Sequence, residues 1–179
     1  MNPRSLYLLL VVLLLHNFSL RSADYFWIGG TGVWNDVAHW STISGGTSAG
    51  TIPTAADNVI FDAASMLAGG TVTMNVPVTV VNFNFSAAPN FTLAGALASI
   101  EIKGNLVANN LATISYAGAI NMFSESLGAV ITSNGRTWGN NFVFTASNGT
   151  NGVTLADALN TAGNISITGG FFNSSGFSI

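Results

Sequence analysis

Hydrophobic and polar residues alternate in short runs along most of the chain. Examples are Val78-Thr79-Val80, Phe83-Asn84-Phe85, Ile100-Glu101-Ile102 and Ile165-Ser166-Ile167. A two-residue period, in segments rich in Val, Ile, Thr and Phe, predicts half-buried β-strands rather than amphipathic helices. Glycine and asparagine separate the runs, as at Gly104-Asn105 and Gly163-Asn164, and these residues favour tight turns. The pattern therefore predicts an all-β chain, with single helical turns at most over 53–57 and 63–68.

A repeat lies under these strands. The order asparagine, apolar, any residue, apolar, hydroxyl occurs at 82–86, 141–145 and 164–168, with poorer copies at Asn105 and Asn121. The five asparagines recur at intervals that are similar but not equal. A unit of roughly 20 residues with two or more short strands is typical of one coil of a β-solenoid. We therefore predict a right-handed parallel β-helix over residues 67–179, in which each strand pairs in register with its equivalent in the next coil.

Stacked coils would also explain the polar composition. Like residues would lie about 4.8 Å apart, where like charges repel and asparagines can form ladders of hydrogen bonds. An antiparallel sandwich is the alternative, because Asn134-Gly135, Asn148-Gly149 and Asn151-Gly152 also fit hairpin turns. The resemblance between the asparagine-led segments favours the solenoid, since the strands of a sandwich need not resemble one another.

Residues 1–23 have a different pattern. Arg4 precedes an unbroken apolar run from Leu6 to Leu15, and Ser22-Ala23 provides small residues further on. This order is that of a secretory signal peptide. A run of that length in a helix spans about 15 Å, half of a hydrocarbon core of about 30 Å, so a transmembrane anchor is the weaker alternative. We expect a helical signal peptide over 1–23, cleaved after Ala23, and a secreted or cell-surface location.

Charged residues are scarce, at 6% of the 179 residues. Beyond Ala23 only Lys103 and Arg136 are basic, against seven Asp and Glu, so the net charge there is −5. So few cations cannot neutralise a phosphate backbone, which argues against nucleic acid as a partner. The chain has no cysteine, which excludes disulfides and thiolate metal sites. No second apolar run approaches the length of a transmembrane helix.

Residues 24–66 carry Trp27, Trp34 and Trp40, three of the four tryptophans. Within this segment the pattern Trp-x-Gly-Gly-x-Gly-x-Trp is followed by Pro-x-x-x-Asp-x-Val-x-Phe at 53–61. The segment resembles the opening of secreted bacterial β-solenoid surface proteins, which include autotransporter-passenger-like and adhesin-like chains of Bacteroidetes-type bacteria. The resemblance implies an exported, repetitive and usually longer protein, and it implies no catalytic residue.

We expect residues 24–66 to form an N-terminal cap. An open solenoid end exposes an apolar cross-section and unpaired strand edges, and each tryptophan can bury about 150–250 Å² there. Glycines at 29, 30 and 32 would let the chain fold Trp27 near Trp34. Asp57 and Asp62 flank a short apolar strand, and we expect them to accept hydrogen bonds from loop N–H groups or an indole. Two alternatives stay open: exposed tryptophans as a platform for sugar rings, and a calcium ion on Asp57 and Asp62.

Candidate catalytic residues are few. His39 is the only histidine beyond the signal peptide, and its neighbours Ala38 and Trp40 indicate a packed residue rather than the base of a nucleophilic triad. Glu101 and Glu125 fall at different phases of the predicted coils, so they do not suggest the carboxylate pair of a glycosidase. Lys103 lies two positions from Glu101, and both are expected outward as a surface ion pair. We therefore predict no enzyme activity, cofactor or metal.

The leading hypothesis is a non-catalytic, structural or adhesin-like solenoid, forming the N-terminal part of a longer exported protein. Cell-surface polysaccharide or host and cell-envelope surfaces are the expected partners. The chain stops within a predicted strand at Phe177-Ser178-Ile179, so we also expect truncation or end-to-end self-association. The alternative is a carbohydrate-binding or lyase-like or hydrolase-like β-helix. Ice binding by threonine arrays ranks third, because Thr-x-Thr occurs only at Thr71 and Thr73.

Overall fold

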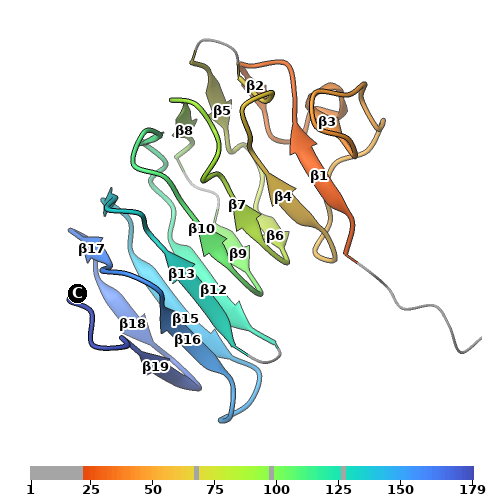
Figure 1. Ribbon diagram of the computed structural model, residues 1–179. Coiled ribbons are helices and arrows are strands. Elements are labelled where there is room, and N and C mark those ends of the chain that lie inside the picture. The colour runs from red at the N-terminus through yellow and green to blue at the C-terminus, as the bar shows by residue number, and fades with distance from the viewer. Residues whose placement is uncertain (1–21, 67–68, 97–98, 126–127) are drawn as a thin grey trace, which may run out of the picture.

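The computed structural model describes residues 22–66, 69–96, 99–125 and 128–179, which wind into a parallel β-solenoid (Figure 1). The predicted all-β, parallel solenoid fold is therefore confirmed, while the right-handed sense of the coil stays a prediction. Among the described residues the one helical element is the 3₁₀ turn η1 (Val37–His39). The predicted signal peptide lies outside the described residues except for Ser22 and Ala23.

Three strand positions, on three faces, make up each full coil. The first face holds β1 (Asp24–Trp27), β4 (Asn58–Ile60), β7 (Phe83–Asn84), β10 (Leu106–Val107), β13 (Ala129–Thr132), β16 (Gly152–Leu155) and β19 (Phe171–Asn173), with β3 (Trp40–Ser41) at its edge. The second holds β2 (Gly32–Val33), β5 (Thr71–Thr73), β8 (Thr92–Ala94) and β11 (Thr113–Ile114). The third holds β6 (Val78–Val80), β9 (Ile100–Ile102), β12 (Ile120–Ser124), β15 (Phe142–Ala146) and β18 (Ile165–Ile167). A separate pair comprises β14 (Thr137–Trp138) and β17 (Asn160–Thr161).

Successive coils are in register on the first face. The aligned inward positions are Val59, Phe83, Leu106, Ile131 and Leu155, so the coils are similar but not identical in length. All five side chains are almost fully buried and form one apolar column. The third face repeats this arrangement, because alternate residues of a strand point to opposite sides. There Val78 and Ile100 point inward, while Thr79 and Glu101 are less buried.

Asparagines of successive coils bond to one another at two corners of the solenoid. Before the first face, Asn82 Nδ2 donates to Asn58 Oδ1 at 2.7 Å, and the Asn105 N–H donates to Asn82 Oδ1 at 2.7 Å. Before the third face, the Asn164 N–H donates to Asn141 Oδ1 at 2.9 Å. The predicted ladder is therefore present at the first corner, and the second corner carries a single asparagine–asparagine hydrogen bond.

The phase of the predicted repeat was wrong. Asn82 and Asn105 precede strands of the first face, whereas Asn141 and Asn164 precede strands of the third. Asn121 lies within β12, where it aligns with Glu101 and Val143. The step from Asn105 to Asn121 is therefore shorter than a coil and leads from one face to another. Strands on all three faces have similar residue patterns, so the asparagine-led repeat combined strands that belong to different faces.

The antiparallel sandwich is contradicted by the strand pairing. β3 pairs antiparallel with β1, and all other pairings among the described strands are parallel. Asn134 and Gly135 do adopt positive φ angles of 51° and 75°. Their turn, however, joins β13 to β14, which lie in different sheets. It bends the chain around a solenoid corner and closes no hairpin.

Strand edges are open at both ends of the described solenoid, and at the N-terminal end β2, β3 and β6 each have a partner strand on one side only. At the N-terminal end β3 pairs along the outer edge of β1 (Figure 1). At the other end β18 and β19 each have a partner strand on one side only. Ile167, Phe171 and Ile179 are 53%, 46% and 61% exposed there. The boundary predicted between 66 and 67 falls within a coil, since β4 already pairs with both β1 and β7.

Candidate functional site

The three N-terminal tryptophans lie in a buried aromatic cluster at the β3 end of the solenoid. Trp27, Trp34 and Trp40 are each at most 1% exposed. The Trp40 ring lies 5.1 Å from that of Trp27 and 4.8 Å from that of Trp34, in both cases edge to face. Trp40 thus sits between the two residues that were expected to meet. The indole faces are covered by protein and offer no platform for a sugar ring.

Local backbone geometry builds this cluster. Gly29 and Gly30 adopt φ angles of 82° and 78°, which favour glycine, and the turn places Trp27 directly opposite Trp40 in the β1–β3 pair. Two of the indole N–H groups are satisfied locally, because Trp27 Nε1 donates to the Gly30 carbonyl and Trp40 Nε1 to the Trp34 carbonyl, both at 2.7 Å. Burial of Trp27 and Trp40 without a lost hydrogen bond stabilises this end of the molecule.

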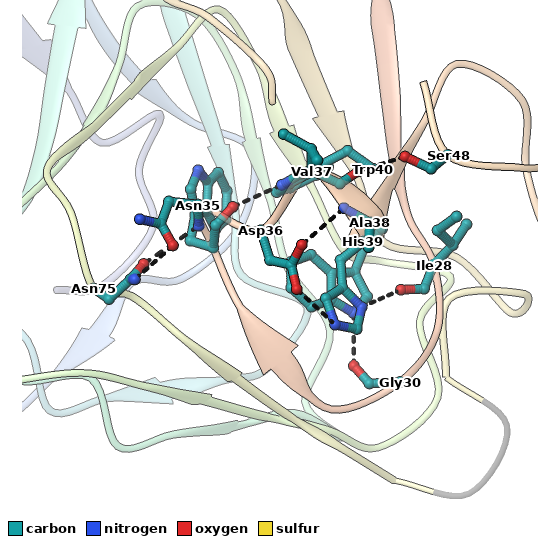
Figure 2. A network of polar contacts seen from close by, with 12 residues as sticks. Ile28, Gly30, Asn35, Asp36, Val37, Ala38, His39, Trp40, Ser48 and Asn75 are labelled. Carbon is teal, nitrogen blue, oxygen red and sulfur yellow. Dashed lines mark hydrogen bonds and ion pairs between the residues drawn. The ribbon is translucent and has the colours of Figure 1, made fainter. Parts of the chain in front are cut away.

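His39 is the packed residue that its neighbours predicted, and Figure 2 shows its contacts. Its ring stacks on Trp27 with 4.7 Å between centroids and 2° between planes. Nδ1 lies 2.7 Å from the Ile28 carbonyl oxygen, which can only accept, so Nδ1 carries the proton. Asp36 Oδ2 lies 4.0 Å from Nε2, and Asp36 Oδ1 accepts the Ala38 N–H at the start of η1. The imidazole therefore ties β1 to η1.

Asp57 and Asp62 act in two separate turns. Asp57 Oδ2 accepts from the Thr54 N–H at 2.8 Å and the Thr54 hydroxyl at 2.7 Å. Asp62 Oδ1 accepts from the Ala64 N–H at 2.9 Å. The predicted loop N–H partners are therefore present, and the indole N–H groups of Trp27, Trp40 and Trp138 donate elsewhere. Among the residues that the structure describes, no group of three or more His, Asp or Glu is placed to hold a metal ion.

A groove of about 510 Å³, which we call the corner groove, crosses the coils beside the asparagine ladder. Its lining includes Ala55, Asn82, Lys103, Asn105, Glu125 and Gly128. Lys103 Nζ lies 2.9 Å from Glu125 Oε1. The ion pair expected between Lys103 and Glu101 was therefore wrong, because the chain of the next coil brings Glu125 closer. Sequence analysis missed this groove, since most of its residues lie outside the asparagine-led repeat and come together only when separate coils stack.

Nothing in the sequence indicated that Arg136 is buried. It is only 5% exposed; Nε donates to the Asn109 carbonyl at 2.7 Å and Nη2 donates to the Ala112 carbonyl. The guanidinium carbon lies 5.8 Å from the Phe85 ring centroid and 5.4 Å from that of Trp138. Among the described residues, Arg136 forms no ion pair with a carboxylate. Burial accordingly lowers the pKa of Arg136 below its ordinary value.

A threonine column runs down the second face. Thr71 aligns with Thr92, and Thr92 with Thr113. The Thr-x-Thr motif does not reveal this column, because the members of the column come from successive coils. The neighbouring column contains Val33, Thr73 and Ala94, so threonine does not repeat in two dimensions. The arrangement gives one row of hydroxyls rather than a flat array.

Comparisons with family models, with curated proteins and with solved structures found no match for this chain. Within the described part of the chain, no helix has the length and apolar character needed to cross a membrane. The fold defines the class of protein as a parallel β-solenoid, and function must be argued from its surfaces and ends.

Proposed function

We propose that this chain is an exported, non-catalytic structural protein of the cell surface. It would form a stiff rod that presents its outer faces for adhesion. The supporting observation is the stack of in-register coils around one apolar core that extends from the N-terminal tryptophans to Leu159. Rods of this kind hold long surfaces at fixed spacing, because each coil contacts only its neighbours along one axis. The adhesin role also rests on the resemblance of the tryptophan motif to secreted bacterial β-solenoid surface proteins.

Residues 24–66 would serve this rod as its N-terminal cap. The aromatic cluster places three buried indoles over the first coil, and β3 occupies the edge of β1. Because β3 is only two residues long, it leaves little edge on which another chain could add a strand. The signal peptide over 1–23, removal of which leaves Asp24 as the new N-terminal residue, would deliver the rod to the outside.

Export and adhesion can be tested separately. A fusion of residues 1–30 to an alkaline phosphatase that is active only after export should give activity, and replacing Leu13 and Leu14 by arginine should abolish it. Beads coated with the chain from Asp24 onward should attach to polysaccharide-coated or cell-envelope surfaces more strongly than beads coated with the heat-unfolded chain. The proposal fails if the chain cleaves polysaccharides to soluble products, or if folded and unfolded coatings attach equally.

A further inference from the structure

The corner groove has the size of a ligand site. Its volume of about 510 Å³ lies within the roughly 300–1,000 Å³ of typical binding clefts. Its lining includes Asn82 and Asn105, which lie one coil apart and thus about 4.8 Å from each other along the solenoid axis. A ligand in this groove would therefore meet the same type of side chain repeatedly along its length.

The ladder fixes the amide groups of the groove in position. Asn82 uses Oδ1 and one hydrogen of Nδ2 within the ladder. Asn105 Oδ1 accepts the Val130 N–H at 3.0 Å, and its Nδ2 bonds to no described residue. A side chain at Gly104 would place its Cβ 2.5 Å from Asn82 Oδ1, so glycine is required for the ladder to close. The outward N–H donors are thus held rigidly and remain available to a ligand.

The charges in the groove cancel each other. Lys103 and Glu125 form an ion pair at 2.9 Å, and the ammonium keeps further hydrogens while the carboxylate keeps a second oxygen. A polyanion would find its one cation already neutralised, and an apolar ligand would desolvate the amides without replacing their hydrogen bonds. Hydroxyl groups both donate and accept, so they can satisfy amide N–H groups and a carboxylate oxygen side by side.

We propose that the corner groove binds a neutral polysaccharide chain, which lies along the solenoid axis and hydrogen-bonds to Asn82, Asn105, Lys103 and Glu125. The proposal does not require the adhesive role of the rod, because it concerns binding by the isolated protein. It also differs from the sugar platform expected at the tryptophans, since the ligand here is held by amides and an ion pair.

Affinity electrophoresis and calorimetry test this with dextran, a β-1,3-glucan and a galactomannan as neutral polymers and polygalacturonate as the anionic one. At least one neutral polymer should retard the full chain, and polygalacturonate should not. Glu125→Gln breaks the ion pair, and Asn105→Asp removes two donors but keeps the acceptor for the Val130 N–H. Each should weaken binding about three- to tenfold, the usual effect of losing one hydrogen bond.

Glu101→Gln is the matched control, because it makes the same chemical change on β9 away from the groove lining and should leave binding unchanged. Melting curves establish that the variants are folded; if Asn105→Asp does not fold, Glu125→Gln carries the test. Retardation by none of the polymers or by polygalacturonate alone overturns the proposal, and so does neutral-polymer binding that Glu125→Gln leaves within twofold of the parent.

Discussion

Several buried polar side chains of this solenoid make their contacts across coils rather than along the chain. Arg136 bonds to carbonyls of the preceding coil, at Asn109 and Ala112, and Asn140 Nδ2 donates to the carbonyls of Tyr116 and Gly118. Such contacts satisfy buried carbonyl groups that the short strands leave outside the sheet ladders. A change at one of these residues should therefore weaken two coils together.

We expect Arg136→Lys to destabilise the protein by about 1–3 kcal/mol, because an ammonium cannot reproduce the fork that reaches two buried carbonyls and stacks on aromatic rings. Urea unfolding measures the loss. Lys103→Met is the comparison: it removes a partly exposed ion pair, which is worth about 1 kcal/mol or less. Equal stabilities for the two variants would show that the carbonyl fork contributes little.

Tyr116 should make the protein sensitive to alkaline pH. Burial raises the pKa of its hydroxyl from 10.0 to about 12, so the unfolded chain ionises first as the pH rises. Stability present below pH 10 is then lost progressively between about pH 10 and 12. Tyr116→Phe should flatten this part of the profile of melting temperature against pH. A profile as steep as that of the parent protein would contradict the assignment.

At the level of elements, the corners between strands decide how closely successive coils approach. Gly139-Asn140 and Gly163-Asn164 have the same sequence and occur before strands of the same face. A Cβ on Gly163 would lie 2.1 Å from the Asn140 carbonyl oxygen, whereas one on Gly139 would meet nothing within 4 Å. Identical dipeptides thus have different steric requirements, which depend on the adjacent coil.

Gly163→Ala should therefore lower the free energy of unfolding by about 1–3 kcal/mol, since the backbone with which its Cβ would clash cannot move without shifting a coil. Gly139→Ala should be neutral or stabilise by up to about 1 kcal/mol through the unfolded state. Chemical denaturation of both variants gives the comparison. A similar effect for the two would mean that the corners are looser than the structure describes.

At the N-terminal end, stability should be most sensitive to side-chain truncation within the aromatic cluster. Trp40→Ala removes the ring that contacts both Trp27 and Trp34, and a cost of about 3–5 kcal/mol is expected for a buried aromatic. Ile43→Ala, at a nearby position that is 70% exposed, should change stability by less than about 0.5 kcal/mol. Both values come from unfolding curves. A loss below about 1 kcal/mol for Trp40→Ala would argue against a capping role.

For the whole molecule, the two ends have different chemistry along one axis. The end that carries β3 holds the buried aromatic cluster, whereas the last described coil exposes Ile167, Phe171 and Ile179 beside the open edges of β18 and β19. Within 152–179 Asp157 is the only charged residue, so two such ends meet little electrostatic repulsion. Unpaired edges of this type add strands from other chains. Association of two copies should therefore occur through this end.

The protein of 179 residues should accordingly self-associate. In sedimentation velocity its sedimentation coefficient should therefore increase with concentration. Replacing Ile167 and Phe171 by lysine places charge on β18 and β19 and should abolish the association. Leu111→Lys, at a position that is 60% exposed elsewhere on the rod, should leave association unchanged. If the lysine pair associates as strongly as the parent, another surface is responsible.

The sequence by itself determined the local features of this protein. The two-residue alternation identified β-strands, because side chains of an extended chain alternate between core and solvent. Asparagine and glycine marked corners, as their backbone preferences require. The resemblance among strands was enough to favour stacked coils over a sandwich, and the positions of Asp57 and Asp62 on either side of a short apolar strand indicated that they accept hydrogen bonds from loop N–H groups.

Only the tertiary structure decided which residues lie above one another. Coil length varies along the first face, as the unequal spacing of Val59, Phe83, Leu106 and Ile131 shows, and a period of two carries no information about the length of a corner. The partner of Lys103, the buried site of Arg136 and the threonine column all depend on that length. Residues one coil apart interact through space at the distance set by hydrogen bonds between strands, and no local preference of the chain encodes that alignment.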